Sequence, residues 1–380
     1  MKNIYADHAA TTPIDSKAAK VMMEVMQESF GNPSSIHSYG RKARQELDKA
    51  RDQLAQTVGA SPDEIVLTSG GTEADNIAII GYAQANKDRG NHIITTKIEH
   101  HAVLHTCEKL EKYGFEITYL PVDNEGFVQL DKLNEAITDR TILITIMHGN
   151  NEVGTLQPIS QIAELASTCN IAFHSDAVQS YGLADIDIND IPLTMMTVSS
   201  HKINGPKGAG FLYVKKGTKL TPFLTGGEQE KKRRAGTENL AAAAGFAKAA
   251  EIAMQERQKR FDTYKTLSDQ FLKALQAEKI PFEMNGPDKG KLPHITNIYF
   301  PNIQLESFLV QLDLAGVAAS SGSACTAGSV EPSHVLSAMF DDKNRASSSV
   351  RFSFGKGNTA DDMEYIAAEI RKILDRIKSI

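Results

Sequence analysis

The stretch that decides the fold is TMMTVSSHKINGPKGAGFLYVKK, residues 194–216. It begins and ends with apolar runs of strand length, TMMTVSS (194–200) and GAGFLYVKK (208–216). The link between these runs is too short for a crossover helix, so we expect the two strands to pair antiparallel. Lys202 stands in this link, next to hydroxyls and an imidazole instead of the charged neighbours of an ordinary surface lysine.

Similar apolar runs precede this stretch, and helical patterns such as TEADNIAIIGYAQANK and PISQIAELASTCN separate several of them. The runs are EIVLTSG (64–70), HIITTKIEH (92–100), EITYLPVD (116–123), TILITIMHG (141–149) and IAFHSDAVQ (171–179). Such alternation predicts a mostly parallel sheet with helices on both faces. We therefore predict an α/β fold, with a large domain over residues 16–257 built on a seven-stranded sheet.

A long helical stretch at 238–279 is expected to cross into a second, smaller domain. The strand-like runs HITNIYFP, GVAASSGSA and SVRFSFGK alternate there with helical patterns at 304–314, 332–339 and 359–378. This mixture is typical of an α+β unit. We predict that residues 1–15 and 258–380 form this small domain.

Composition narrows the function classes. The chain has 380 residues, enough for about two domains with a substantial core. Its net charge of −6 argues against a general nucleic-acid binder. No apolar run approaches the roughly 18 residues that span a membrane, and the start, MKNIYADHAATTP, lacks the apolar region of a secretory signal. We expect a cytoplasmic protein that binds neither nucleic acid nor a membrane.

The three cysteines, Cys107, Cys169 and Cys325, are odd in number and share no metal-ligand spacing, so we expect no disulfide framework and no metal site. Cys107 and Cys169 fall in helical patterns and are expected to be small packed thiols. Cys325 lies in AASSGSACTAGS (318–329), whose side chains are too small to pack a core, so we expect a mobile loop over about 318–330. A reactive thiol is one hypothesis for it, and a merely flexible linker is the other.

Polar residues follow several of the expected strands, where open α/β sheets bind ligands. Desolvation there would lower the pKa of Lys202 and free an amine nucleophile, although a buried ion pair is the alternative. Asp176, with Gln179 three residues on, could bind a metal, hold a protonated ring nitrogen or, as the default, cap a helix. Arg351 alternates with apolar residues in SVRFSFGK and needs a carboxylate from the protein or from a substrate.

TSGGTEAD (68–75) follows a strand and opens a helix. Residues 72–75 have the form of a capping box, and the glycines would let backbone N–H groups approach an anion such as a phosphate. A plain strand–turn–helix is the alternative. His100 ends its strand and is a candidate site residue. His101 and His105 lack a carboxylate base between them and are expected to be solvated.

Ordered motifs extend over nearly the whole chain. They are ADHAATTP (6–13), FGNPSSIH (30–37), TSGGTEADN (68–76), EHHAVL (99–104), NNEVG (150–154), HSDAVQ (174–179), SSHKINGPKG (199–208), RRAGTEN (233–239), SSGSACTAG (320–328) and VRFSFG (350–355). Together they resemble the cysteine desulfurases, the NifS/IscS-like group of class-V, fold-type I enzymes that use pyridoxal 5′-phosphate. The long Cys-bearing segment resembles the NifS/IscS branch more than the SufS-like branch, whose segment is shorter.

The resemblance implies roles for the candidate residues. Lys202 would bind the cofactor covalently and move the substrate's α-proton, and Asp176 would pair with the pyridinium nitrogen. His100 would stack on the ring. The other implied cofactor contacts are Gln179 at the phenolic oxygen, Asn151 beside the ring, Gly71, Thr72, Ser199 and His201 at the phosphate, and Thr237 at the phosphate of the neighbouring subunit. A homodimer is therefore implied.

The implied activity converts L-cysteine to L-alanine. Arg351, with Asn151 beside it, would bind the substrate carboxylate, and Cys325 would attack the substrate sulfur and keep it as a persulfide. An acceptor protein, such as an iron–sulfur scaffold or a tRNA- or cofactor-thiolating enzyme, would then receive the sulfur. The alternatives are a selenocysteine lyase, a class-V aminotransferase, which needs no mobile thiol, and a non-catalytic sulfur-carrier scaffold, which does not need Lys202.

The loop TGGEQEKKRRAGT departs from the pattern. Glu228 and Lys232 stand where relatives commonly carry glycine, which puts the details of gating or acceptor docking in doubt. EKKRR (230–234) is expected to be a solvated loop, because five basic-rich residues in an acidic chain do not make a nucleic-acid site.

Overall fold

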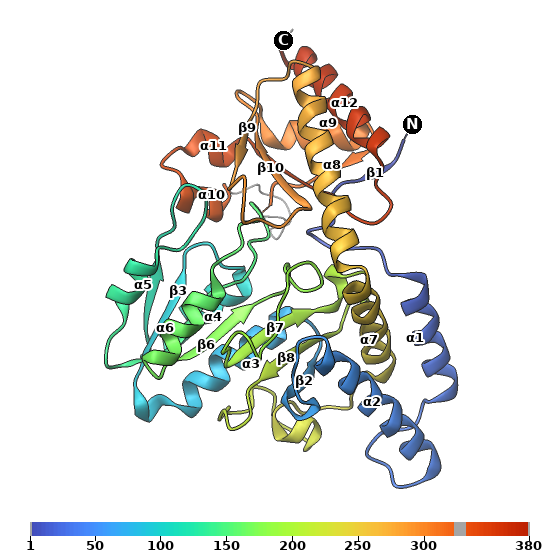
Figure 1. Ribbon diagram of the computed structural model, residues 1–380, viewed down its shortest axis with the longest axis vertical. Helices are drawn as coiled ribbons and strands as arrows, with labels where there is room; N and C mark the ends of the chain where they lie inside the picture. Colours follow the sequence, from blue (N-terminus) through green and yellow to red (C-terminus); the bar gives the residue numbers. More distant parts are fainter. Residues whose placement is uncertain (1, 323–331, 379–380) are drawn as a thin grey trace.

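A seven-stranded sheet forms the centre of the computed structural model, which describes residues 2–322 and 332–378 (Figure 1). The strand order is β2-β8-β7-β6-β5-β3-β4. The strands are β2 (Ile65–Thr68), β3 (His92–Thr96), β4 (Glu116–Leu120), β5 (Thr141–Thr145), β6 (Ala172–Asp176), β7 (Met195–Ser199) and β8 (Gly210–Val214). All seven lie within the runs from which the sheet was predicted. β8 is antiparallel to β7, as expected, and also to β2, while the other pairs are parallel.

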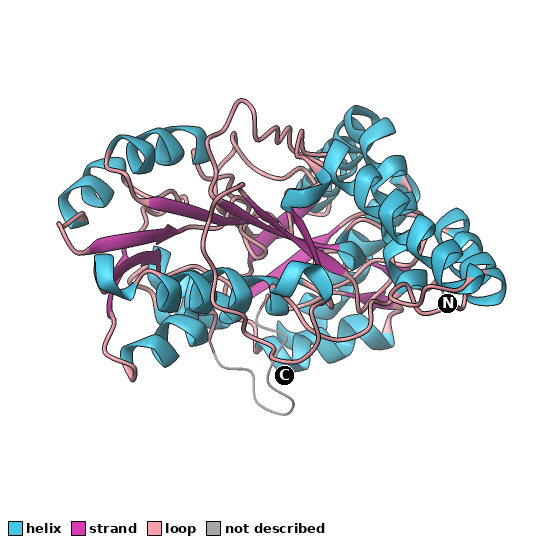
Figure 2. Cartoon of the chain, turned by 90° about the horizontal axis from the view of Figure 1, so that it is seen from below, coloured by secondary structure: helices cyan, strands magenta, loops and turns pink. Residues whose placement is uncertain are grey.

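Helices cover both faces of this sheet, as the view in Figure 2 shows. The inner strands β3, β5 and β7 consist of buried residues throughout, because a parallel sheet covered on both faces has no solvent side. The helices before and between the strands are α1 (Ser16–Glu28), α2 (Ser38–Gln56), α3 (Gly71–Ala85), α4 (His101–Glu111), α5 (Leu130–Ala136) and α6 (Ile159–Thr168). Short 3₁₀ turns lie at η1 (Pro62–Glu64), η2 (Lys87–Arg89), η3 (Ser200–Lys202) and η4 (Gln229–Lys232). The predicted α/β architecture is confirmed.

The long helical stretch expected at 238–279 consists of two helices, α7 (Leu240–Gln255) and α8 (Arg257–Ala277). They meet at Glu256, whose φ of −100° and ψ of 4° interrupt the helical geometry. The alanine-rich α7 is buried over most of its length against α1 and α2. The chain then continues along α8 toward the second sheet (Figure 1).

A smaller unit surrounds an antiparallel sheet of order β12-β10-β9. Its strands are β9 (Glu283–Asn285), β10 (Ile295–Tyr299) and β12 (Ser349–Ser353), and β1 (Ile4–Tyr5) pairs with β11 (Val317–Ala318) beside it. Its helices are α9 (Leu305–Leu314), α10 (His334–Met339), α11 (Lys343–Ser347) and α12 (Ala360–Lys378). Phe271, Phe308 and Phe352 belong to an apolar cluster that is separate from the one around the large sheet. The exact domain limits stay a prediction.

The parallel strands determine where a ligand can bind. β3, β5, β6 and β7 run parallel to one another, so their carboxyl ends meet at one edge of the sheet. Asp176 is the last residue of β6, and the segments that follow β3, β5 and β7 contain His100, Asn151 and Lys202. None of the helices within the described ranges combines the length and apolar character that a membrane span requires.

Candidate active site

A cavity of about 360 Å³ lies at this edge of the sheet. Ten residues predicted from the sequence line it: Gly71, Thr72, His100, Asn151, Asp176, Gln179, Ser199, His201, Lys202 and Arg351. Thr237 instead lines a separate cavity of about 160 Å³. Cys325 lies outside the described residues. The fold therefore brings together residues from distant parts of the sequence, from Gly71 to Arg351.

Lys202 reaches the cavity from η3, directly after β7. Its Nζ donates to the carbonyl oxygens of Ala9 and Ala10, at 2.5 and 2.8 Å. The Nε2 of Gln179 donates to the same Ala9 oxygen at 2.8 Å. The N-terminal motif ADHAATTP thus holds the lysine amine at the cavity wall, where it can meet a ligand.

Asp176 ends β6 and is 5% exposed. Its Oδ1 accepts a hydrogen bond from the backbone N of Val178 at 2.8 Å. Burial raises the pKa of this carboxyl, and the positive charge of Lys202 opposes that rise. A buried carboxylate beside a cavity, with a cation near it, is suited to hold a protonated ring nitrogen.

Two further buried carboxyls, those of Glu99 and Asp75, interact with the charge of Asp176, and Asp75 is a cavity residue that the sequence analysis missed. Glu99 accepts hydrogen bonds from Thr96 Oγ1 at 2.7 Å and from the backbone N of Met147 at 3.0 Å. Burial raises its pKa to about 8. Asp75 lines the cavity, and burial together with the negative charge of Asp176 raises its pKa. Apart from the helical register of α3, no sequence signal indicated that Asp75 points inward.

The capping box predicted for residues 72–75 is wrong. The helix α3 begins at Gly71, and its N-cap is Gly70, which has no side chain with which to cap the first turn. Glu73 instead accepts a hydrogen bond from the backbone N of Ser69 at 2.7 Å. The first-turn N–H groups of α3 therefore remain available for an anion.

The surroundings of this helix end fit a phosphate. A Cβ on Gly71 would lie 2.9 Å from Val178 Cγ2, and one on Gly210 would lie 2.8 Å from the Cα of Gly70, so both glycines permit close packing. Thr72, Ser199 and His201, which supply hydroxyl and imidazole groups, line the adjoining space. Hydrogen-bond donors of this kind at a helix N-terminus are the usual surroundings of a bound phosphate.

His100 is the N-cap of α4, and its Nδ1 accepts a hydrogen bond from Ala102 N at 3.1 Å. The proton of the neutral ring is therefore on Nε2. Burial, and then the charge of Lys202, lower the pKa of His100 to about 4. The ring is therefore neutral at pH 7 and lines the cavity as an uncharged aromatic group.

The expectation that His101 and His105 are both solvated holds for His105 and is wrong for His101. His101 is partly buried and lines the cavity. Its ring centroid lies 4.9 Å from that of His105 and 4.7 Å from that of His334. His334 comes from α10, in a distant part of the sequence, so local spacing could not reveal this contact.

Arg351 lies on β12 and is 2% exposed. Its guanidinium donates to the carbonyl oxygen of Asn151 at 2.9 Å and to Asp7 Oδ1 at 2.7 Å. Of the two partners that the sequence left open, the structure therefore provides a protein acid. The Nε of Arg351 is buried without a hydrogen-bond partner among the described residues.

The two cysteines within the described residues differ. Cys107 is buried in the core, and burial raises its thiol pKa, so it is chemically inert. Cys169 follows α6 at its C-cap and is exposed, so the prediction of a packed thiol is wrong for it. Neither belongs to the described residues that line the 360 Å³ cavity.

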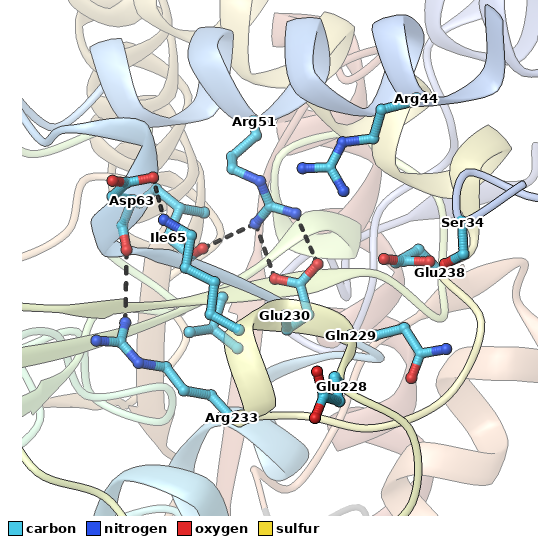
Figure 3. A pocket seen from close by; sticks show the side chains of 12 residues that line it. Ser34, Arg44, Arg51, Asp63, Ile65, Glu228, Gln229, Glu230, Arg233 and Glu238 are labelled. Carbon is cyan, nitrogen blue, oxygen red and sulfur yellow. Dashed lines mark hydrogen bonds and ion pairs between the residues drawn. The ribbon is translucent and has the colours of Figure 1, made fainter. Parts of the chain in front are cut away.

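The loop that carries Thr237 is held by a buried ion pair, drawn in Figure 3. Glu230 accepts two hydrogen bonds from Arg51, at 2.8 and 2.6 Å, and one from Leu67 N at 2.9 Å. Because Glu230 is buried, the prediction of a solvated EKKRR loop is wrong at this residue. Glu230, Lys231 and Lys232 have φ of 47°, 56° and 66°, a left-handed conformation that suits glycine and strains other residues.

Glu230→Ala is expected to destabilise the protein by about 3–5 kcal/mol, because Arg51 would keep a buried charge without its partner. The free energy of unfolding, measured by denaturant titration at fixed protein concentration, checks this value. Glu228→Ala is the matched control, since the Glu228–Lys232 pair is exposed and contributes about 0–1 kcal/mol. An equal loss of unfolding free energy in the two variants would contradict a stabilising role for the buried Arg51–Glu230 pair.

Comparison with known proteins agrees with this geometry. The aminotransferase class-V family matches residues 4–366. A Bacillus subtilis (strain 168) protein named as a candidate cysteine desulfurase IscS 1 is 53% identical over 99% of this chain and 100% of its own length. The cysteine desulfurase IscS of Dictyoglomus turgidum is 45% identical over 100% of this chain and 96% of its own length. A solved NifS-like protein superposes with a TM-score of 0.92 at 34% identity, covering 98% of this chain and 99% of its own.

Proposed function

Because the chain belongs to the class-V aminotransferase family and is a cysteine desulfurase, we propose that it binds pyridoxal 5′-phosphate at Lys202 and moves sulfur from L-cysteine to Cys325. The observation that carries this proposal is the meeting of ten predicted residues in one cavity. A solved relative described as SspA in complex with cysteine, 36% identical with a TM-score of 0.83, supports cysteine as the substrate.

The family depends on pyridoxal phosphate in general, and the cavity has the groups to hold it. The N-terminus of α3 with Thr72, Ser199 and His201 would bind the phosphate. Asp176 would pair with the ring nitrogen, and His100 would stack on the ring. When bound, the cofactor acts as an electron sink for the negative charge left by removal of a substrate proton.

Residues of the chain remove the substrate proton and bind the substrate carboxylate. The neutral amine of Lys202 takes the α-proton of the substrate as a general base. Arg351 and Asn151, which both line the cavity, hold the substrate carboxylate and orient the Cα–H bond toward that amine.

Cys325, which lies outside the described residues, is the proposed acceptor of the substrate sulfur. Its thiolate attacks the substrate sulfur, so a new S–S bond forms and the Cβ–S bond breaks. The electron pair of the broken bond stays on the carbon skeleton, which takes up a proton and leaves as alanine. The products are a persulfide on Cys325 and L-alanine, and the step needs no external oxidant or reductant.

We further propose a homodimer and an acceptor protein. Thr237 is exposed and lines a different cavity from the one that Lys202 lines. This position supports the proposal that Thr237 binds the cofactor phosphate of a partner subunit. The acceptor would be an iron–sulfur scaffold or a thiolating enzyme, and a cytoplasmic location stays a prediction. The relatives' names favour desulfurase activity over selenocysteine lyase, aminotransferase or scaffold alternatives.

We expect the purified chain, supplied with pyridoxal phosphate, L-cysteine and a thiol reductant, to release alanine and sulfide in equal amounts. L-serine, which has oxygen in place of sulfur, is the control and should give no alanine. Quantitative amino-acid analysis and a colorimetric sulfide assay measure the two products. Transfer of the amino group to a 2-oxo acid, without formation of alanine from cysteine, would instead indicate an aminotransferase.

A further inference from the structure

The segment 323–331 is flanked on both sides by residues that contact one buried carboxylate, Glu152. On one side, Ser333 Oγ donates to Glu152 Oε2 at 2.5 Å. On the other, Gly322 packs so closely that a Cβ there would lie 2.6 Å from the same Oε2. Two positions separated by ten residues in the sequence thus meet at a single oxygen atom.

Each flank is also fixed by a different part of the fold. Ser320 exchanges backbone hydrogen bonds with Arg351, at 3.2 and 2.7 Å, and its Oγ accepts from Gly322 N at 3.2 Å. Ser333 is the N-cap of α10, where its Oγ accepts from Leu336 N at 3.0 Å. Glu152 therefore joins the β12 side of the small sheet to the start of a helix.

Glu152 is itself held firmly. Its backbone N donates to Asn150 Oδ1 at 2.8 Å, and its carbonyl oxygen accepts from Asn297 Nδ2, on β10, at 3.1 Å. It is 1% exposed and lines the cavity. Burial raises the pKa of Glu152, while the Ser333 hydrogen bond and the charges of Arg351 and His101 oppose that rise.

We propose that Glu152 is a positioning residue for sulfur transfer, which fixes Gly322 and Ser333, on the two sides of the segment 323–331, at the cavity. Glu152 directly follows Asn151 in the sequence, and the carbonyl oxygen of Asn151 accepts a hydrogen bond from Arg351. The same turn of backbone therefore contacts the substrate-binding Arg351 as well as Gly322 and Ser333. The inference rests on the proposed role of Cys325. It adds a residue that affects the Cys325 thiol only indirectly, through Gly322 and Ser333. This residue takes no part in proton removal.

Substitutions at Glu152 separate positioning from charge. Glu152→Gln keeps a carbonyl oxygen that can accept from Ser333, whereas Glu152→Asp keeps the charge but withdraws the oxygen by one carbon–carbon bond, about 1.5 Å. Because a misplacement of this size can cost about 10²-fold in rate, we expect single-turnover sulfur transfer to fall about 10²-fold in Glu152→Asp and Glu152→Ala. Glu152→Gln should stay near the wild-type rate. The reverse order, with Asp active and Gln inactive, would overturn the inference, because charge would then be the property that matters.

A second readout excludes a merely structural role. Exchange of the α-proton of L-alanine in heavy water needs Lys202 and the cofactor but no thiol, and NMR can follow it. We expect this exchange to be unchanged in all three Glu152 variants. An equal loss of exchange and of sulfur transfer would show general damage to the site and would contradict positioning.

Gly322→Ala tests the same contact from the other side. Its φ of +90° and the 2.6 Å approach to Glu152 Oε2 mean that an alanine must displace the carboxylate or the segment end. Gly217→Ala is the matched control, because Gly217 also has φ of +90° but no described atom lies within 4 Å of an added Cβ. Only the first substitution should lower sulfur transfer, while both carry the same backbone strain.

Cys325→Ala, measured alongside, keeps the two proposals distinguishable. Normal sulfur transfer in Cys325→Ala would refute the proposed function itself. Loss of transfer in Cys325→Ala, with wild-type transfer in Glu152→Asp and Gly322→Ala, would refute the positioning role alone. Should Glu152→Ala fail to fold, the Asp, Gln and Gly322 variants still decide the question.

Discussion

Lys202→Ala is expected to abolish alanine production from cysteine. Loss of a general base alone lowers the rate roughly 10²–10⁴-fold, and loss of the covalent anchor for the cofactor lowers it further. In the fold, the lysine amine lies at the cavity with Asp176 and is held by the carbonyl oxygens of Ala9 and Ala10. Alanine at position 202 leaves the rest of the cavity in place but removes the amine that the reaction needs.

Two measurements check this expectation. Steady-state assays give the loss of turnover, and borohydride reduction followed by peptide mass spectrometry locates the cofactor. The wild-type protein should carry the cofactor mass on the peptide that contains Lys202. Lys215→Ala, at an exposed lysine just after β8, is the control and should retain full turnover. Undiminished turnover in Lys202→Ala, or reduction onto another lysine, would refute the assignment.

Cys325→Ala is expected to lose sulfur release by a factor on the order of 10³ or more, as substitution of a nucleophile commonly does. The variant should still bind the cofactor and exchange the α-proton of L-alanine, because the thiol acts only after proton removal. Cysteine-dependent sulfide release and NMR-detected exchange separate these steps.

Cys169→Ala is the matched control for the thiol. Cys169 is the exposed cysteine within the described part of the chain, and it lies outside the set of described residues that line the cavity. Its substitution should leave sulfide release unchanged. If Cys169→Ala lost activity and Cys325→Ala kept it, the sulfur carrier would have been assigned to the wrong residue.

The large sheet could be predicted because its strands are short apolar runs, such as TILIT in β5, that are buried on both faces. The residues of the cavity could be located for a related reason. Parallel strands place the residues that follow them at one edge, so Asp176 and Lys202 meet although each was found separately. Family resemblance then supplied their roles.

Contacts between distant segments could not be predicted in the same way. The pairing of Arg351 with Asp7 and the tilted ring contact of His101 with His334 depend on how the small sheet and α10 pack against the large one. Sequence periodicity reports a local face, and it does not identify the partner of that face. The capping box predicted at 72–75 was wrong for another reason. The helix begins earlier than the pattern suggested, and its N-cap is Gly70, which has no side chain that could accept a hydrogen bond.

The most direct test of the account is the location of sulfur after one turnover without an acceptor. The protein is mixed with an equimolar amount of L-cysteine, alkylated and examined by peptide mass spectrometry. The account predicts one additional sulfur atom on the peptide that contains Cys325, in an amount equal to the alanine formed. Alanine formation with the added sulfur on Cys107 or Cys169, or with no protein-bound sulfur, would contradict it.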